Sequence, residues 1–306
     1  MKNIYLIILL FSICNLSYGQ ESFKKKYFVP NYIVLGKTDT VYLFRDSLVS
    51  FKNLSPQERE AIKNSYKSSP TITKTEEVII NNKKVMVAKN IVVDQSFYET
   101  LSINKPQKMT DQKINGFVKF EEDGKLYVNR FLKLDSLGNY TRFPIAYYQL
   151  KNRQAVKLCF TEFSVSALVI PVKYRVKKND LPEDFSTAVN GNIFVGYSGG
   201  SSSFFHQEKV GNKTNTWKLT GGFMFGASSV TLDENNTNLS AKAITDDRKV
   251  SKGLVNIGVG AAYAYNKINL GIFYGYDYAI GDNAEIWNYN KKPWWGIGLG
   301  YSLFNF

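Results

Sequence analysis

The chain has 306 residues, of which 44% are hydrophobic and 15% aromatic, and its formal net charge is +13. It holds one histidine and two cysteines, so a transition-metal site, which needs several such ligands, is not expected. After the N-terminus no stretch reaches the ~18 consecutive apolar residues of a transmembrane helix.

Residues 1–19 are predicted to be a cleaved secretion signal. Lys2 precedes an apolar run from Ile4 to Ile13, and residues 17–19 place small side chains where a signal peptidase reads them. The mature chain is therefore expected to begin at Gln20.

Neither cysteine is expected to be modified or paired. Cys14 lies inside the predicted signal and follows Ile13, where a lipidation site needs a small residue. Cys159 is then the only cysteine of the mature chain, which excludes an intramolecular disulfide.

Residues 20–154 are predicted to form a β-rich periplasmic region with one helix near residues 55–66. Ser55 is a helix N-cap, Pro56 suits the first helical position, and Glu58 completes a capping box. The lysines of this region are interpreted as a solvated surface, so no nucleic-acid partner is expected. The expected hairpins join Tyr32–Leu35 to Thr40–Phe44, Val78–Ile80 to Val85–Val87, and Phe117–Phe120 to Leu126–Val128.

Residues 155–306 alternate between bulky apolar residues and small or polar ones, with the period of two of a β-strand. The pattern is clearest in Val255–Tyr265, Ile268–Tyr278 and Trp295–Leu303. Bulky residues on one face with glycine opposite suit the lipid-facing wall of an outer-membrane β-barrel. A soluble sandwich would carry lysine and glutamate on its outward face. We therefore expect a mainly all-β chain with an antiparallel transmembrane barrel.

About eight strands are predicted for this barrel. Six alternating segments are evident, among them Leu168–Val176, and Val156–Val165 and Ser201–Gln207 are two further candidates. Bacterial outer-membrane barrels generally begin at eight strands. The long polar connections Leu232–Lys249 and Gly281–Lys292 are predicted to face outward, and the short turns the periplasm.

Four charged residues are predicted to point into the lumen. Lys173, Arg175 and Asp277 fall on the face opposite the bulky residues, and Glu162 is placed with them. Buried charges must be paired, so an internal salt-bridge network is expected. A narrow polar path for a small solute or an ion is the alternative.

Aromatic residues near the last long connection are interpreted as a girdle at headgroup depth. Sugar binding by stacking is the alternative interpretation. The girdle residues are Tyr276, Tyr278, Trp287, Tyr289, Trp294 and Trp295.

The segment Gly296–Ser302, preceded by two tryptophans and followed by an aromatic last residue, resembles the C-terminal strand of small Gram-negative outer-membrane β-barrel proteins. The resemblance covers about half of the chain. It implies recognition by the barrel-assembly machinery through Tyr301, Phe304 and Phe306. Both phenylalanines fall on the parity of the glycines, which implies a bulge or an exit from the membrane near Leu303.

No catalytic, cofactor-binding or metal-binding residue is predicted. His206 lies close in sequence to Ser201–Ser203 and Glu208, which are the residue types of an acyl hydrolase. Residues of a catalytic triad normally converge from separate segments, however, so this proximity alone does not predict one.

The predicted function is therefore a non-enzymatic structural or interaction role in the cell envelope. The expected partners are outer-membrane lipid, the assembly machinery during biogenesis, and an unidentified envelope protein or glycan. Three alternatives are a narrow pore, an outer-membrane lipid-modifying acyl hydrolase, and a secreted soluble β-protein.

Overall fold

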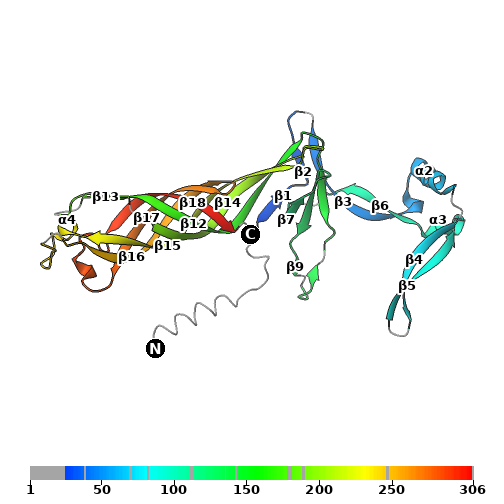
Figure 1. The fold of residues 1–306 in the computed structure, drawn as a ribbon. Coiled ribbons are helices and arrows are strands. Elements are labelled where there is room, and N and C mark those ends of the chain that lie inside the picture. The colour runs from blue at the N-terminus through cyan, green and yellow to red at the C-terminus, as the bar shows by residue number, and fades with distance from the viewer. Residues whose placement is uncertain are drawn as a thin grey trace.

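The computed structural model describes residues 25–304 except 38, 69–70, 81–82, 111–112, 135, 142, 178–180, 188–189 and 246–247. The fold is mainly β, with one large antiparallel sheet and few helices (Figure 1). The predicted signal at residues 1–19 lies outside the described residues, as does Phe306.

Six long strands in the C-terminal half close into a ring. Each pairs antiparallel with the next, and β12 pairs with both β14 and β18, so the ring has no open edge along this stretch. Short elements in the connections are β13 (Asp184–Ser186), α4 (Glu234–Thr237) and the 3-10 helix η3 (Ala284–Ile286). The ring strands are β12 (Ala155–Arg175), β14 (Asn190–Phe205), β15 (Lys213–Leu232), β16 (Val250–Tyr265), β17 (Ile268–Ile280) and β18 (Pro293–Phe304).

The prediction of eight strands is wrong, because two pairs of predicted strands are each one continuous strand. Val156–Val165 and Leu168–Val176 merge into β12, which has 21 residues. The candidate at Ser201–Gln207 belongs to β14, which has 16 residues. These two strands pair without interruption from Ala155 to Leu168. The glycines at 199 and 200 lie inside the strand and do not end it.

The N-terminal region continues the sheet of the ring through β12. β1 pairs with β12 at Cys159–Thr161, beyond the point where β18 ends its pairing at Val165. From β1 the sheet continues in the order β7, β8, β11, β3 and β2. Its strands are β1 (Lys26–Val29), β2 (Tyr32–Val34), β3 (Thr40–Ser50), β6 (Ser102–Lys108), β7 (Ile114–Phe120), β8 (Lys125–Arg130) and β11 (Ala146–Gln149), with β9 (Lys133–Leu134) and β10 (Tyr140–Thr141) pairing beside it.

The first residues of β12 and the last residues of β14 extend past the ring and pack on this N-terminal sheet. Leu158 and Phe160 of β12 and Phe204 of β14 are buried there against Leu43 and Tyr148. The hydrophobic effect thus stabilises the joint between the two parts of the chain in a core of its own.

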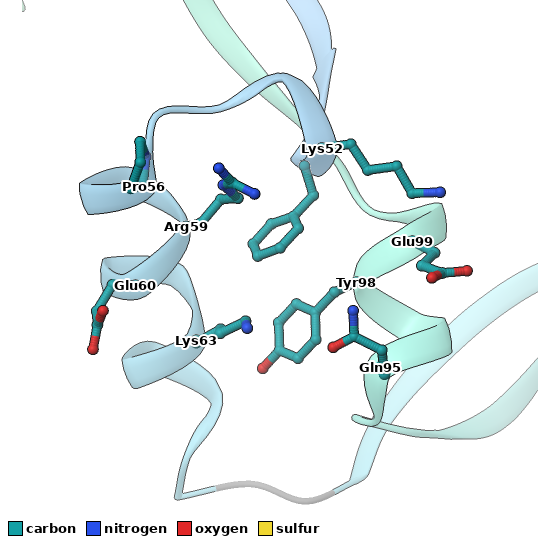
Figure 2. Close-up of a pocket in the computed structure, with 9 residues that line it drawn as sticks. Lys52, Pro56, Arg59, Glu60, Lys63, Gln95, Tyr98 and Glu99 are labelled. Atoms are coloured by element: carbon teal, nitrogen blue, oxygen red, sulfur yellow. The ribbon is translucent and has the colours of Figure 1, made fainter.

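A small lobe stands at the far end of the ribbon formed by β3 and β6 (Figure 1). Its aromatic side chains pack together, with the ring centroids of Phe51 and Tyr98 5.0 Å apart. Figure 2 shows Tyr98 between the helices of the lobe. The lobe consists of the 3-10 helix η2 (Phe51–Asn53), α2 (Pro56–Tyr66), β4 (Thr71–Ile80), β5 (Lys83–Val92) and α3 (Gln95–Thr100).

The helix and the three hairpins predicted from the sequence of this region are confirmed. α2 begins after the Ser55 N-cap with a complete capping box. The hairpins are β2–β3, β4–β5 and β7–β8. α3 was not predicted, although Asp94 caps its first turn.

The capping box of α2 makes the lobe sensitive to acid. Lys105 and Ser55 both donate to the Glu58 carboxylate and lower its pKa from 4.5 to about 2. Because the folded pKa is the lower one, this stabilisation is complete above pH 4.5 and is lost as the pH falls toward 2. An NMR titration of the Glu58 carboxyl carbon should give a midpoint near 2, which Lys105→Met raises. A midpoint near 4.5 in the unmodified chain would contradict the capping geometry.

Candidate functional site

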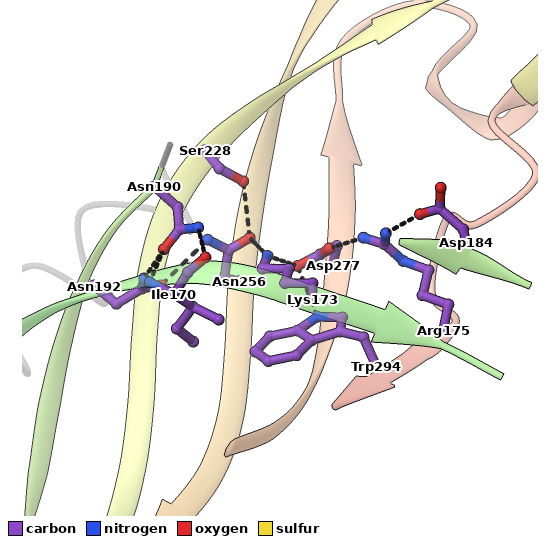
Figure 3. A network of polar contacts seen from close by, with 10 residues as sticks. All are labelled: Ile170, Lys173, Arg175, Asp184, Asn190, Asn192, Ser228, Asn256, Asp277 and Trp294. Carbon is purple, nitrogen blue, oxygen red and sulfur yellow. Dashed lines mark hydrogen bonds and ion pairs between the residues drawn. The ribbon is translucent and has the colours of Figure 1, made fainter. Parts of the chain in front are cut away.

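A buried ion network crosses the interior of the ring near its long connections (Figure 3). Lys173 Nζ donates to Asp277 Oδ1 at 2.7 Å, and Arg175 Nη2 donates to Asp277 Oδ2 at 2.5 Å. The side chains of Lys173, Arg175 and Asp277 are 5%, 3% and 0% exposed. The structure therefore brings together three of the four charges predicted to face the lumen.

Neighbouring groups add hydrogen bonds and ring contacts to this network, whereas Arg175 Nε has no hydrogen-bond partner among the described residues. Trp294 Nε1 donates to Asp277 Oδ1 at 2.9 Å, and the Lys173 ammonium lies 4.5 Å from the Trp294 ring centroid. Asp184, at the rim, accepts from Arg175 Nη1 at 2.5 Å. Asn256 Oδ1 lies 3.3 Å from Lys173 Nζ. The two carboxylates balance the two cations, so the network is neutral as a whole.

Pro171 explains why the inward face of β12 changes from even-numbered to odd-numbered residues along the strand. The pairing register of β12 and β18 shifts between Val169 and Val172. Proline has no N–H to donate to the ladder, and such residues occur at bulges. Before the bulge even-numbered residues face inward, and after it Lys173 and Arg175 do. The predicted outward face of Leu168 and Ile170 is therefore wrong, since both are buried inside the ring.

Glu162 faces the interior but belongs to a second pair. Lys218 Nζ donates to Glu162 Oε1 at 2.6 Å, and their side chains are 3% and 1% exposed. Ser164 also accepts from Lys218, at 2.9 Å. Lys218 was not predicted from the sequence. Side chains alternate along β15, and Leu219 faces outward, so alternation places the neighbouring Lys218 in the interior.

An apolar layer separates the two ion clusters. Along β12, Leu168 and Ile170 lie between Glu162 and Lys173, and along β17 the ring of Phe273 precedes Asp277. Phe273 packs edge to face on Phe194 at 5.1 Å. This layer of side chains fills the interior between the clusters, so the charges do not line up as one polar path through the described part of the ring.

The connections fold over the end of the ring beside the Asp277 network. Leu181, Leu232, Leu254, Ile286 and Trp287 form a core there. A cavity of about 250 Å³ remains between this core and the network, lined also by Ser186 and Asn190. Its hydroxyl and amide groups beside balanced charges suit ordered water or a small neutral polar solute better than an ion.

Of the six residues predicted to form an aromatic girdle, three are exposed and three are buried. Tyr276, Tyr278 and Trp295 are exposed on the outer face of the ring. Trp294, in contrast, is fully buried, because it shares the parity of Gly296 and Gly298. Trp287 and Tyr289 are also buried, and their rings lie 5.3 and 5.4 Å from the Arg175 guanidinium carbon. These three residues are interior packing residues and belong to no outer girdle.

The residues named for an acyl hydrolase do not converge. His206 is buried, and its Nδ1 lies 2.7 Å from Asn212 Oδ1. Ser202 instead hydrogen-bonds Tyr27 and Thr216. Glu208 is exposed, and its backbone N–H donates to Asn152. Across the described ranges, no three His, Cys, Asp or Glu side chains are grouped to hold a metal.

The residues of the predicted assembly signal lie at the end of β18. Tyr301 is exposed on the outer face, as its parity predicts. The backbone of Phe304 pairs with Val165 after a register shift, which agrees with the expected bulge near Leu303. Phe306 lies outside the described residues, so its role stays a prediction.

No helix in the described part of the chain is long and apolar enough to cross a membrane. Comparison with known proteins finds no matching family, no similar curated protein and no similar solved structure.

Proposed function

We propose that the ring of six strands is a transmembrane β-barrel and that the protein is an integral outer-membrane protein with a structural or interaction role. The observation that carries the proposal is the outer surface of the ring. Outward residues such as Phe223, Ile257, Ile272 and Leu299 are between 49% and 70% exposed. A soluble monomer rarely leaves so continuous an apolar surface in water.

The dimensions and composition of this surface fit a bilayer. The outward apolar runs Leu219–Ala227, Val255–Tyr263, Leu270–Tyr278 and Trp295–Leu303 are each about nine residues long, close to what a tilted membrane strand needs. None of the described outward positions in these four runs carries a charged residue.

Exposed aromatic residues border this surface at both ends. Tyr276 and Tyr278 lie toward the long connections, whereas Trp217, Tyr265 and Tyr301 lie toward the short turns. Amphipathic rings in two belts are typical of membrane interfaces. The second belt was not predicted from the sequence, and it supports a spanning orientation.

Six strands are fewer than the eight of the smallest bacterial outer-membrane barrels, and glycine accounts for the tight closure. Gly196 of β14 faces Gly222 of β15 directly. A Cβ added at Gly222 would lie 2.1 Å from the Val195 carbonyl oxygen. A narrow ring needs such small inward residues, because its diameter falls with strand number.

The connections suggest the orientation. Short connections, residues 206–212 and 266–267, join β14 to β15 and β16 to β17 at the end where the N-terminal sheet attaches. The longer connections, including residues 233–249 and 281–292, lie at the other end (Figure 1). Barrels of the outer membrane have short periplasmic turns and longer external loops. We therefore place the N-terminal region and its lobe in the periplasm.

The packed interior favours a structural or interaction role over transport or catalysis. The apolar layer of Phe194, Phe273 and Ile170 argues against a pore. The dispersed positions of Ser202, His206 and Glu208 argue against an acyl hydrolase.

Folding from urea into lipid vesicles tests the proposal. A closed membrane barrel keeps its hydrogen bonds in detergent gels, so the vesicle-folded chain should migrate differently before and after boiling. Its strands should also resist added protease in vesicles. A chain that stays outside the vesicles and shows a single gel band under both conditions would contradict a membrane-spanning ring.

A further inference from the structure

A second pocket lies in the N-terminal lobe, away from the ring. It has a volume of about 270 Å³ and opens between η2, α2 and α3. Its size fits a ligand of about one ring rather than a drug-sized or polymeric one. None of the interior charges of the ring lines it.

One wall of this lobe pocket is aromatic. Phe51 is buried beneath it, and Tyr98 packs on Phe51 and on Phe97. Lys63 Nζ lies 5.8 Å from the Tyr98 ring centroid. Flat aromatic faces of this kind accept the apolar face of a ring-shaped ligand by stacking.

Basic groups supply the other wall. Lys52, Arg59 and Lys63 line the pocket together with two carboxylates, Glu60 and Glu99, which leaves one excess positive charge. Figure 2 shows Lys63 directed toward Tyr98, whereas Glu60 points away from the enclosed space.

Arg59, which lines the lobe pocket, has one hydrogen-bond donor without a partner in the described part of the chain. Its Nε is buried and has no hydrogen-bond partner among the described residues. A buried donor without a partner is costly, and a guanidinium matches a carboxylate with two parallel hydrogen bonds. Arg59 lines the lobe pocket, so a carboxylate bound there would pair with its guanidinium.

We propose that the lobe pocket binds a sugar that carries a single carboxylate. The sugar ring stacks on Tyr98, and Arg59 with Lys63 binds the carboxylate. The Gln95 amide and the Tyr98 hydroxyl are the neutral groups that hydrogen-bond the sugar hydroxyls. One excess positive charge and two nearby carboxylates disfavour polyanions such as nucleotides.

Calorimetric titration of the full chain, folded in detergent micelles, tests this assignment. The probe is N-acetylmuramic acid, and the matched control is N-acetylglucosamine, which lacks the carboxylate. The acid should bind about 10-fold more tightly or better, as expected for a charge-assisted hydrogen bond. Equal affinity for both sugars, or no binding of the acid, would overturn the proposal.

Variants of the lobe separate binding from folding. Arg59→Gln should remove the preference for the acid, and Tyr98→Leu should weaken binding of both sugars. Lys67→Gln removes a charge from the same lobe at an exposed position outside the pocket and should change neither. A preference that survives Arg59→Gln, while circular dichroism shows every variant folded, would contradict the assignment. The binding result does not depend on whether the ring spans a membrane, so the two proposals fail separately.

Discussion

Replacing Asp277 by alanine is expected to lower the free energy of unfolding by ~3–5 kcal/mol, because two buried cations then lose their shared carboxylate. Asp277 accepts hydrogen bonds from Lys173, Arg175 and Trp294 and is fully buried. Thermal unfolding of the micelle-folded chain, followed by tryptophan fluorescence, measures the loss. Asp282→Ala is the matched control, since this exposed aspartate lies just beyond the same strand.

A second substitution, at one of the two cations, should recover part of the lost free energy of unfolding. Without Asp277, Lys173 keeps the neutral Asn256 oxygen and the Trp294 ring but no carboxylate, whereas Arg175 keeps Asp184. Lys173→Met in the Asp277→Ala background should therefore restore more stability than Arg175→Met. In an open aqueous channel these charges would be hydrated, so unchanged melting together with steady bilayer currents would contradict the closed interior.

Arginine at Ile272 is expected to destabilise the membrane-inserted ring by ~2–4 kcal/mol, as for a charge facing lipid near the bilayer midplane. Ile272 is 63% exposed and pairs with Ala261 and Ile297, midway between the two aromatic belts. Urea titration of the chain folded in vesicles measures the effect.

The same strand offers a control for depth. Ile280 points to the same face as Ile272 but lies beyond Tyr278, toward the long connections. Arginine there should cost ~0–1 kcal/mol, the value for the interface. Equal tolerance of arginine at Ile272 and at Ile280 would be inconsistent with lipid around the ring.

The faces of β14 to β18 could be predicted from sequence parity, because a strand's side chains alternate strictly. Ile257, Leu270 and Ile297 lie outside, and Asn256, Asp277 and Gly296 inside. Alternation fails at a bulge, and Pro171 marks one. A period-two pattern does not show whether a proline or a glycine ends a strand, shifts its register or leaves it unchanged. The predicted strand count was wrong for this reason, because the two glycines at 199 and 200 do not end β14.

The positions of loop aromatics could not be predicted in this way. Trp287 and Tyr289 lie in the connection between β17 and β18, where no period applies, and tertiary packing over Arg175 decides their burial. Trp294 is different, since it lies within β18 and its parity already placed it inside. The lobe pocket also could not be predicted, because Arg59 lies in α2 and Tyr98 in α3. These helices are separated in the sequence by β4 and β5 and come together only in the folded chain.

Separation of cell envelopes tests most directly whether the ring of six strands lies in the outer membrane. After expression with its own N-terminus in a Gram-negative host, the mature chain should begin at Gln20, sediment with outer membranes and stay with them through carbonate extraction. Recovery as a soluble periplasmic monomer with one gel mobility before and after heating would contradict the account.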